Sequence, residues 1–131
     1  MGLDNGIILR RKTTNDVVKV TPEYFCVEKP DNTLCYWRKC WNIRKAFLNV
    51  LDKPDNLKNE SYYLIEYEDI PAIMRGIIKL FDKDTWEESN DSIWEFDKIK
   101  EDLVTDLVNL KLLQRYLKEN KDVIALFYDS Y

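Results

Sequence analysis

The chain has 131 residues, of which 45% are hydrophobic and 34% are charged, and it contains no histidine. This length and composition predict one folded domain spanning residues 1–131, with a buried core, and exclude a disordered chain. The absence of histidine excludes Ser-His-Asp and Cys-His catalytic arrangements and His-ligated metal sites. It therefore disfavours an enzyme, although carboxylates, Lys, Tyr or a lone Cys still leave that question open.

Hydropathy and cysteine content indicate where the protein works. No apolar run approaches the ~18 residues of a membrane span, and the first residues do not resemble a signal peptide. Cys26, Cys35 and Cys40 are an odd number, which favours free thiols in a reducing compartment. We therefore expect a cytoplasmic protein with no membrane partner, no bound metal and no cofactor.

The formal net charge of −4 conceals an uneven distribution. Residues 1–58 carry 11 Lys and Arg against 7 Asp and Glu, whereas residues 59–131 carry 9 against 17. The first part is thus basic by four charges and the second acidic by eight. An acidic protein is a poor general ligand for phosphate backbones, so nucleic acid is an unfavoured partner. The two parts are more simply explained as neutralising one another across the fold.

The first third of the chain predicts short strands separated by turns. Asp4-Asn5-Gly6 is typical of a turn, and the apolar run 7–9 after it predicts a buried strand. Residues 17–20 predict a weaker strand closed by Thr21-Pro22, and residues 28–32 predict a loop.

A first helix is predicted over residues 34–51 and ends before Pro54, which cannot continue a helix. The prediction rests on apolar residues that recur at helical spacing: Tyr36, Cys40, Ile43, Phe47 and Leu51. Residues 62–65 are rich in strand-forming side chains and predict a strand.

Helical periodicity is strongest over residues 70–81, which predicts a second helix. Asp69 is its predicted N-cap, and Pro71 fits its first turn. A third helix is predicted over 97–119, capped by Asp97, after an acidic connection at 82–96. Residues 123–128 predict a strand apolar enough to be central. Strands and helices without regular alternation indicate an α+β fold, a small mixed or antiparallel sheet packed by about three helices.

The predicted third helix carries two apolar stripes rather than one. The second stripe consists of Val104, Val108 and Leu112, on roughly the opposite side from the first. A helix that covers one face of a sheet needs a single stripe, so this helix is either enclosed within the domain or meets another chain. Helix 97–119 is accordingly a candidate surface for a homo-oligomer.

The segment 36–45 combines four cations and three aromatic residues with no acid. Its candidate binding residues are Trp37, Arg38, Lys39, Trp41, Arg44 and Lys45. A functional interpretation is a cationic, aromatic-backed patch for a phosphate, a nucleotide or an acidic partner. The alternative is structural: the rings pack, and the cations pair with the acidic part at the surface, each pair contributing at most about 1 kcal/mol.

Acidic residues offer weaker candidates. Those of residues 82–102 lack the spacing and the glycine of a calcium loop, which favours a solvated acidic segment. Asp106 lies close to the first stripe of helix 97–119, so it is either at the edge of that stripe and faces water, or buried and paired. No P-loop, nucleophile elbow or zinc-protease motif occurs.

The order of several short motifs resembles a protein family. They are Met1-Gly2-Leu3-Asp4, Tyr36-Trp37-Arg38-Lys39, Tyr62-Tyr63 and an aromatic strand after a long helix. Small proteins of this kind occur in bacteriophages, prophages and bacterial genomes, and the resemblance implies no established activity, cofactor or catalytic residue. The chain differs from the family pattern YWRKANxIHxWF, with Trp41 in place of Asn, Arg44 in place of His and Ala46 in place of Trp.

Three functions follow as hypotheses. The first is a non-enzymatic, phage- or mobile-element-type accessory protein that binds another macromolecule, most simply a protein. The second is a protein that binds a nucleotide or another phosphorylated small molecule through segment 36–45. The third is a structural homo-oligomer.

Overall fold

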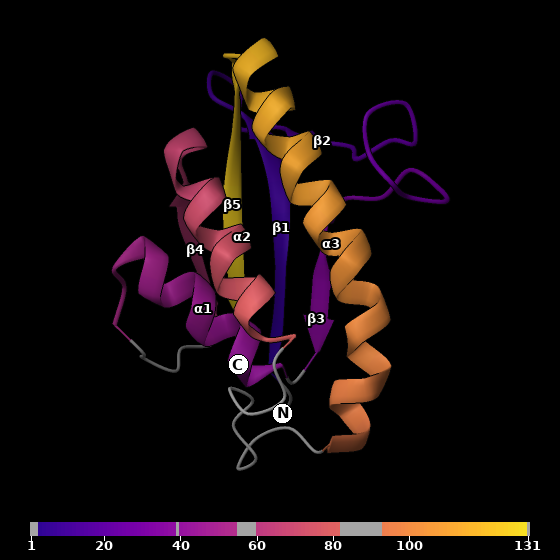
Figure 1. The fold of residues 1–131 in the computed structure, drawn as a ribbon. Helices are drawn as coiled ribbons and strands as arrows, with labels where there is room; N and C mark the ends of the chain where they lie inside the picture. Colours follow the sequence, from indigo (N-terminus) through magenta and orange to yellow (C-terminus); the bar gives the residue numbers. More distant parts are fainter. Residues whose placement is uncertain (1–2, 39, 55–59, 82–92, 131) are drawn as a thin grey trace.

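The computed structural model describes residues 3–38, 40–54, 60–81 and 93–130, and over 93–100 the backbone alone. Lys39 lies outside the described residues, and so does most of the predicted acidic connection at 82–96. The described part folds as an α+β domain of three α-helices and one five-stranded antiparallel sheet, as predicted (Figure 1). The strands are β1 (Asp4–Arg11), β2 (Val17–Val18), β3 (Tyr36–Arg38), β4 (Ser61–Ile65) and β5 (Val123–Ser130). The helices are α1 (Trp41–Leu51), α2 (Ile70–Lys79) and α3 (Ile93–Glu119), with a 3-10 turn at Tyr67–Asp69.

Strand β5 is the centre of the sheet, which confirms the prediction for residues 123–128. The strand order is β2-β1-β5-β4, and β3 pairs with the other end of β1. Phe127 stands opposite Ile7 on one side and Tyr63 on the other. Alternate β5 residues are buried, namely Val123, Ala125, Phe127 and Asp129.

Strand β1 begins earlier than predicted, because Asp4-Asn5-Gly6 is part of the strand rather than a turn. These residues pair with β5 through Asn5↔Asp129 and with β3 through Gly6↔Tyr36. The glycine at position 6 has a packing reason, since a Cβ there would stand 2.7 Å from the carbonyl oxygen of Cys35. Long-range pairing thus overrides a local turn signal.

The predicted helix over 34–51 is wrong in its first part. Residues 36–38 form β3 against β1, and α1 begins at Trp41. Backbone hydrogen bonds extend the pairing, with Ile7 N–H donating to Cys35 and Leu34 N–H donating to Ile7. Asp52, with a φ of 54°, ends α1 in the left-handed conformation two residues before Pro54.

The helices α2 and α3 confirm two predictions, although α3 begins earlier and α2 ends earlier than predicted. Asp69 is at the N-cap position of α2 and Pro71 lies in its first turn, both as predicted. The Asp69 carboxylate does not bond to α2 but accepts the N–H of Glu66, which begins the preceding 3-10 turn. Helix α3 begins at Ile93, so Asp97 lies within it rather than at its N-cap. No described helix is long and apolar enough to cross a membrane.

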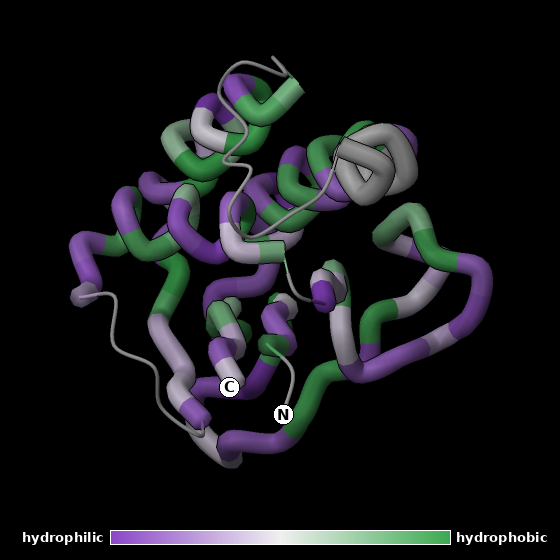
Figure 2. Tube along the Cα trace, turned by 90° about the horizontal axis from the view of Figure 1, so that it is seen from below, coloured by the Kyte–Doolittle hydropathy of each residue, from purple (hydrophilic) through white to green (hydrophobic). Residues whose placement is uncertain are grey.

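All three helices lie on one side of the sheet, as the view along the strands shows (Figure 2). Helices α1 and α2 contact each other, and α3 runs the length of the sheet beside them (Figure 1). The core lies between these two layers. It combines Ile43 and Phe47 of α1, Ile73 and Ile77 of α2, Leu103 and Leu110 of α3, and Ile7, Leu9 and Phe127 of the sheet.

Candidate functional site

The structure distributes the residues of segment 36–45 over different surroundings. Trp37 lies on β3 and is buried, whereas its neighbour Arg38 is exposed. On α1, Trp41 is half-buried, Arg44 is buried and Lys45 is exposed. Because a strand and a helix share this segment, its side chains do not have the arrangement that a single helix over 34–51 would give them.

Arg44 is the most deeply buried cation of the described chain, with 2% of its surface exposed. Its Nε and Nη2 atoms donate to the two carboxylate oxygens of Asp129, at 2.9 and 3.1 Å. Asn5 donates from Nδ2 to the same carboxylate at 2.8 Å, across the Asn5↔Asp129 pair of β1 and β5. This bidentate ion pair links α1 to the sheet. The Arg44 guanidinium therefore stabilises the interior of the protein and does not face solvent.

Trp37 connects β3 to α3. Its indole Nε1–H donates to the Asp106 carboxylate at 2.8 Å, and its ring packs on Phe47 with centroids 5.3 Å apart. Asp106 is therefore partly buried and hydrogen-bonded to an indole, rather than facing water at the edge of the stripe. Cys35 lies beside it, and burial together with the Asp106 charge raises the pKa of this thiol well above its usual value. A thiol held protonated in this way is a poor nucleophile at neutral pH.

Burial raises the pKa of Asp106 from 3.8 to about 6, against the opposing effect of the Trp37 hydrogen bond. The folded pKa exceeds the unfolded one, so the contribution of Asp106 to stability is fully present below the unfolded value and is lost as the pH rises through the folded value. We expect Asp106→Asn to remove this loss. The free energy of unfolding of the variant should exceed that of the wild type by about 1–3 kcal/mol at about pH 7.5. The two values should match near about pH 4.

Urea unfolding over a series of pH values measures this effect directly. An equal gap between the two proteins at both ends of the series would contradict the assignment to Asp106, because a pH-independent gap reports a change in packing.

The cysteines, all of which the structure describes, form no disulfide with one another. Cys35 and Cys40 are buried, and Cys26 is exposed. Within the described ranges, no group of three or more His, Cys, Asp or Glu side chains converges on a point where a metal could bind. The absence of a metal remains a prediction, to be checked by elemental analysis.

The face of the sheet turned away from the helices, here called the open face, is rich in aromatic and aliphatic side chains. Strand register places them in three rows, since directly paired residues share a face. The rows are Tyr36, Tyr128 and Tyr62; Ile8, Leu126 and Leu64; and Val17, Arg10 and Ile124. Four of these side chains are more than a third exposed: Val17 (46%), Tyr36 (58%), Tyr62 (41%) and Leu64 (44%).

Arg10 is the one cation in these rows, and its side chain extends from its own row to that of Tyr62. Its guanidinium carbon is 5.5 Å from the centroid of the Tyr62 ring, which in turn packs against Tyr128 at 5.3 Å. The Nε atom of Arg10 is buried and lacks a hydrogen-bond partner among the described residues. The open face thus offers apolar area together with a desolvated donor. No helix of the described part of the chain covers it.

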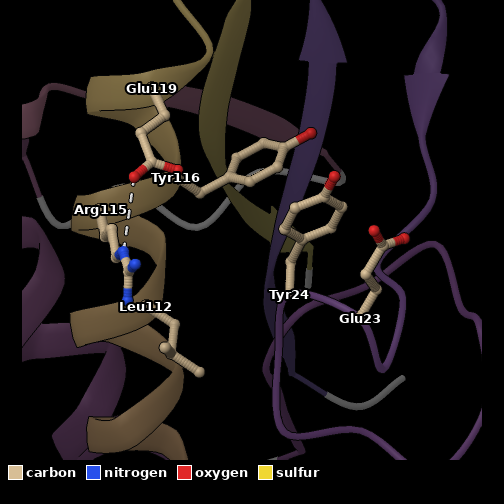
Figure 3. A pocket seen from close by; sticks show the side chains of 6 residues that line it. All are labelled: Glu23, Tyr24, Leu112, Arg115, Tyr116 and Glu119. Carbon is tan, nitrogen blue, oxygen red and sulfur yellow. Dashed lines mark hydrogen bonds and ion pairs between the residues drawn. The ribbon is translucent and has the colours of Figure 1, made fainter.

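A hollow of about 250 Å³ lies between α3 and the loop that follows β2 (Figure 3). Tyr24 and Tyr116 face one another there nearly edge to face, with centroids 5.3 Å apart. The loop is fixed to α3 by Asn109, whose side-chain amide both accepts the N–H of Cys26 and donates to its carbonyl. Glu23, Glu119 and Arg115 supply charges of both signs, and Arg115 pairs with Glu119 at 3.5 Å. This mixed lining selects no particular ligand charge.

Comparison with known proteins gave no match to any protein-family model, to any curated protein or to any solved structure. The resemblance to small phage and prophage proteins therefore stays a prediction.

Sequence reasoning missed the open face, although its signal is present. Tyr62, Leu64, Leu126 and Tyr128 alternate with residues that face the helices, so both faces of β4 and β5 are apolar. An apolar strand is ordinarily taken as one buried on both sides. Only the placement of all three helices on one side distinguishes a covered sheet from an open one.

Proposed function

We propose that this protein is a non-enzymatic accessory protein of the phage or mobile-element type, which acts by binding another protein through the open face. The observation that carries the proposal is the exposed apolar and aromatic surface of Tyr36, Tyr62 and Leu64 beside Arg10. Extended apolar patches on small proteins mark interaction surfaces, and aromatic residues and Arg are enriched at the centres of protein interfaces.

Arg10 suggests the chemistry of the partner. A carboxylate of the partner placed beside this guanidinium would satisfy the orphaned Nε donor in a water-excluded site, where a charged hydrogen bond is strong. The partner surface that fits the open face is therefore apolar, with an acidic side chain near its middle.

The proposal is tested by Leu64→Glu, which places a charge in the open face at a position already 44% exposed. Ile78→Glu is the matched control, because Ile78 is 52% exposed on α2 in the helix layer. Tagged wild type and both variants are incubated with lysate of the natural host cells. We expect Leu64→Glu to reduce the captured partner more than tenfold, the effect of burying an unpaired charge in an interface.

Both variants should keep the melting temperature of the wild type, which separates loss of binding from loss of fold. Equal capture by Leu64→Glu and the wild type would contradict the open face as the binding surface.

A structural homo-oligomer is the second candidate, because Val104 (55%) and Val108 (43%) are exposed one turn apart on α3. Light scattering on the same purified proteins distinguishes the two candidates. A dimer that persists in Leu64→Glu and dissociates in Val108→Glu would favour the homo-oligomer.

A further inference from the structure

Strand β4 forms an outer edge of the sheet, since the strand order ends with it and no strand of the described residues lies on its other side (Figure 1). The edge of a sheet presents unpaired backbone N–H and C=O groups, which can pair with a strand of another chain. The hydrogen bonds of the neighbouring strands show which residues of β4 present these groups.

The alternation of hydrogen bonds across the sheet determines where the backbone of β4 points. Ile7 bonds toward the β3 side, because its N–H donates to Cys35 and its carbonyl accepts from Leu34. Its partner on β5, Phe127, therefore directs its own backbone groups to the other side, toward Tyr63 of β4. Because the pattern alternates along a strand, the residues on either side of Tyr63 direct their groups away from β5.

These two residues are Tyr62 and Leu64, and each presents one N–H and one C=O at the outer edge. No described residue outside the sheet bonds to these backbone groups. Their side chains belong to the open face and are 41% and 44% exposed. The edge thus combines unpaired backbone groups with apolar and aromatic surface.

Acidic side chains lie at both ends of β4. Glu60 precedes the strand, Glu66 and Glu68 follow it, and all three are exposed. Glu60 accepts the hydroxyl of Tyr62 and Glu66 accepts a backbone N–H of the 3-10 turn, and neither neutral donor cancels the charge. None of the three carboxylates forms an ion pair with another described residue.

Two cations approach the middle of β4, but they lie over its rings. Arg10 is 5.5 Å from the ring centroid of Tyr62, and Lys53 is 5.8 Å from that of Tyr63. Because successive residues of a strand face opposite sides of the sheet, one cation lies on each face rather than beside the edge. A strand added beside β4 would therefore meet acidic side chains near both of its own ends.

From this arrangement we infer that β4 binds an extended segment of the partner protein as an added strand, with apolar residues at alternate positions and Lys or Arg near both ends. The apolar side chains would continue the rows of Tyr62 and Leu64 on the open face, so the inference rests on the proposed function. Backbone hydrogen bonds give this mode of docking its affinity, and the alternate side chains give it specificity.

A second copy of β4 fits the edge less well. In the antiparallel register that pairs Tyr62 of one copy with Leu64 of the other, Glu60 of each copy stands opposite Glu66 of the other. Like charges placed directly opposite one another destabilise strand pairing, and charged edges oppose edge-to-edge association. The same carboxylates attract a strand with basic ends.

The probe for this inference is a synthetic peptide of alternating valine and threonine with lysines at both ends, titrated into the full chain. At saturation we expect hydrogen exchange of the Tyr62 and Leu64 amides, measured by NMR, to slow by about tenfold or more, because both N–H groups become hydrogen-bonded. The Tyr63 amide already bonds to β5 and should change less.

Leu64→Pro removes an outward N–H and leaves the bonds of Tyr63 to β5 intact, since proline is tolerated at edge positions whose N–H faces solvent. We expect it to weaken peptide binding by about tenfold or more, because the ring also blocks the approach of a partner carbonyl. Leu64→Thr is the control, which keeps the N–H and should bind within about threefold of the wild type. Both variants should keep the fold, as checked by melting temperature.

Three further peptides test the inference on wild-type protein alone. Two carry N-methyl groups on one or the other alternate set of residues, and we expect the set that faces β4 to abolish binding and the other set to preserve it. The third has glutamates in place of the lysines and should bind about tenfold more weakly at low salt.

No binding of the lysine peptide, equal effects of the two N-methylated sets, or equal binding of the lysine and glutamate peptides would overturn the inference. A dimer of the wild type that dissociates in Leu64→Pro would also overturn it, in favour of a second copy. The proposed function is judged separately, because partner capture by Leu64→Glu depends on the open face and not on strand pairing.

Discussion

Arg44→Ala is expected to destabilise the protein by about 3–5 kcal/mol, because it removes one partner of a buried ion pair. The Asp129 carboxylate, 5% exposed, would be left buried without its counter-ion, with Asn5 Nδ2 still donating to it at 2.8 Å. A loss of this size is a large share of the ~5–15 kcal/mol that stabilises a small domain. Segment 36–45 taken as a surface patch predicts a far smaller loss, of about 1 kcal/mol at most.

Lys45→Ala is the neighbouring control, since Lys45 is exposed and even an ion pair at an exposed position contributes at most about 1 kcal/mol. Urea unfolding followed by tryptophan fluorescence measures both variants. A loss below about 1 kcal/mol for Arg44→Ala would show that the ion pair is replaced by solvent at little cost.

The second large effect is expected for Phe127→Ala, at about 3–5 kcal/mol. Phe127 is fully buried on β5 and stacks on Phe47 of α1, with centroids 4.4 Å apart and planes 8° apart. Truncation would leave a cavity at the contact between the sheet and the helix layer. Cavities of this kind relax only partly, so the lost contacts add to the lost burial.

Leu126→Ala, one residue earlier on the open face, provides the comparison. Leu126 is partly buried, and we expect a loss of about 1 kcal/mol. The difference between adjacent positions of one strand, measured by urea unfolding, reports directly which face carries the core. Similar losses at both positions would mean that the open face is as closely packed as the other.

Local patterns predicted most of the fold. The periodicity of 70–81 and the apolar runs at 62–65 and 123–128 each specify their element within a few residues, because amphipathic spacing and strand propensity act locally. The segment 34–40 was misassigned to a helix because the positions of Tyr36 and Cys40 happen to continue the helical spacing of the apolar residues in α1. Its pairing partner is β1, about thirty positions earlier, and no local signal encodes that pairing.

The candidate sites were less predictable, because their partners are distant in sequence. Arg44 meets Asp129 across 85 positions, and Trp37 meets Asp106 across 69. The composition of segment 36–45 indicated that its cations and rings matter, but not whether they face water.

The pairing of β1 with β5 has a consequence for how the chain folds during its synthesis. Asn5 and Asp129 are 124 positions apart, yet they are direct neighbours in the sheet. Strand β1 is synthesised before β5, and the apolar side chains of Ile7 and Leu9 lack their final cover until β5 is made. Contacts of such long range slow folding and prolong exposure to aggregation. The pairing of β1 is thus completed only after strand β5 has been synthesised.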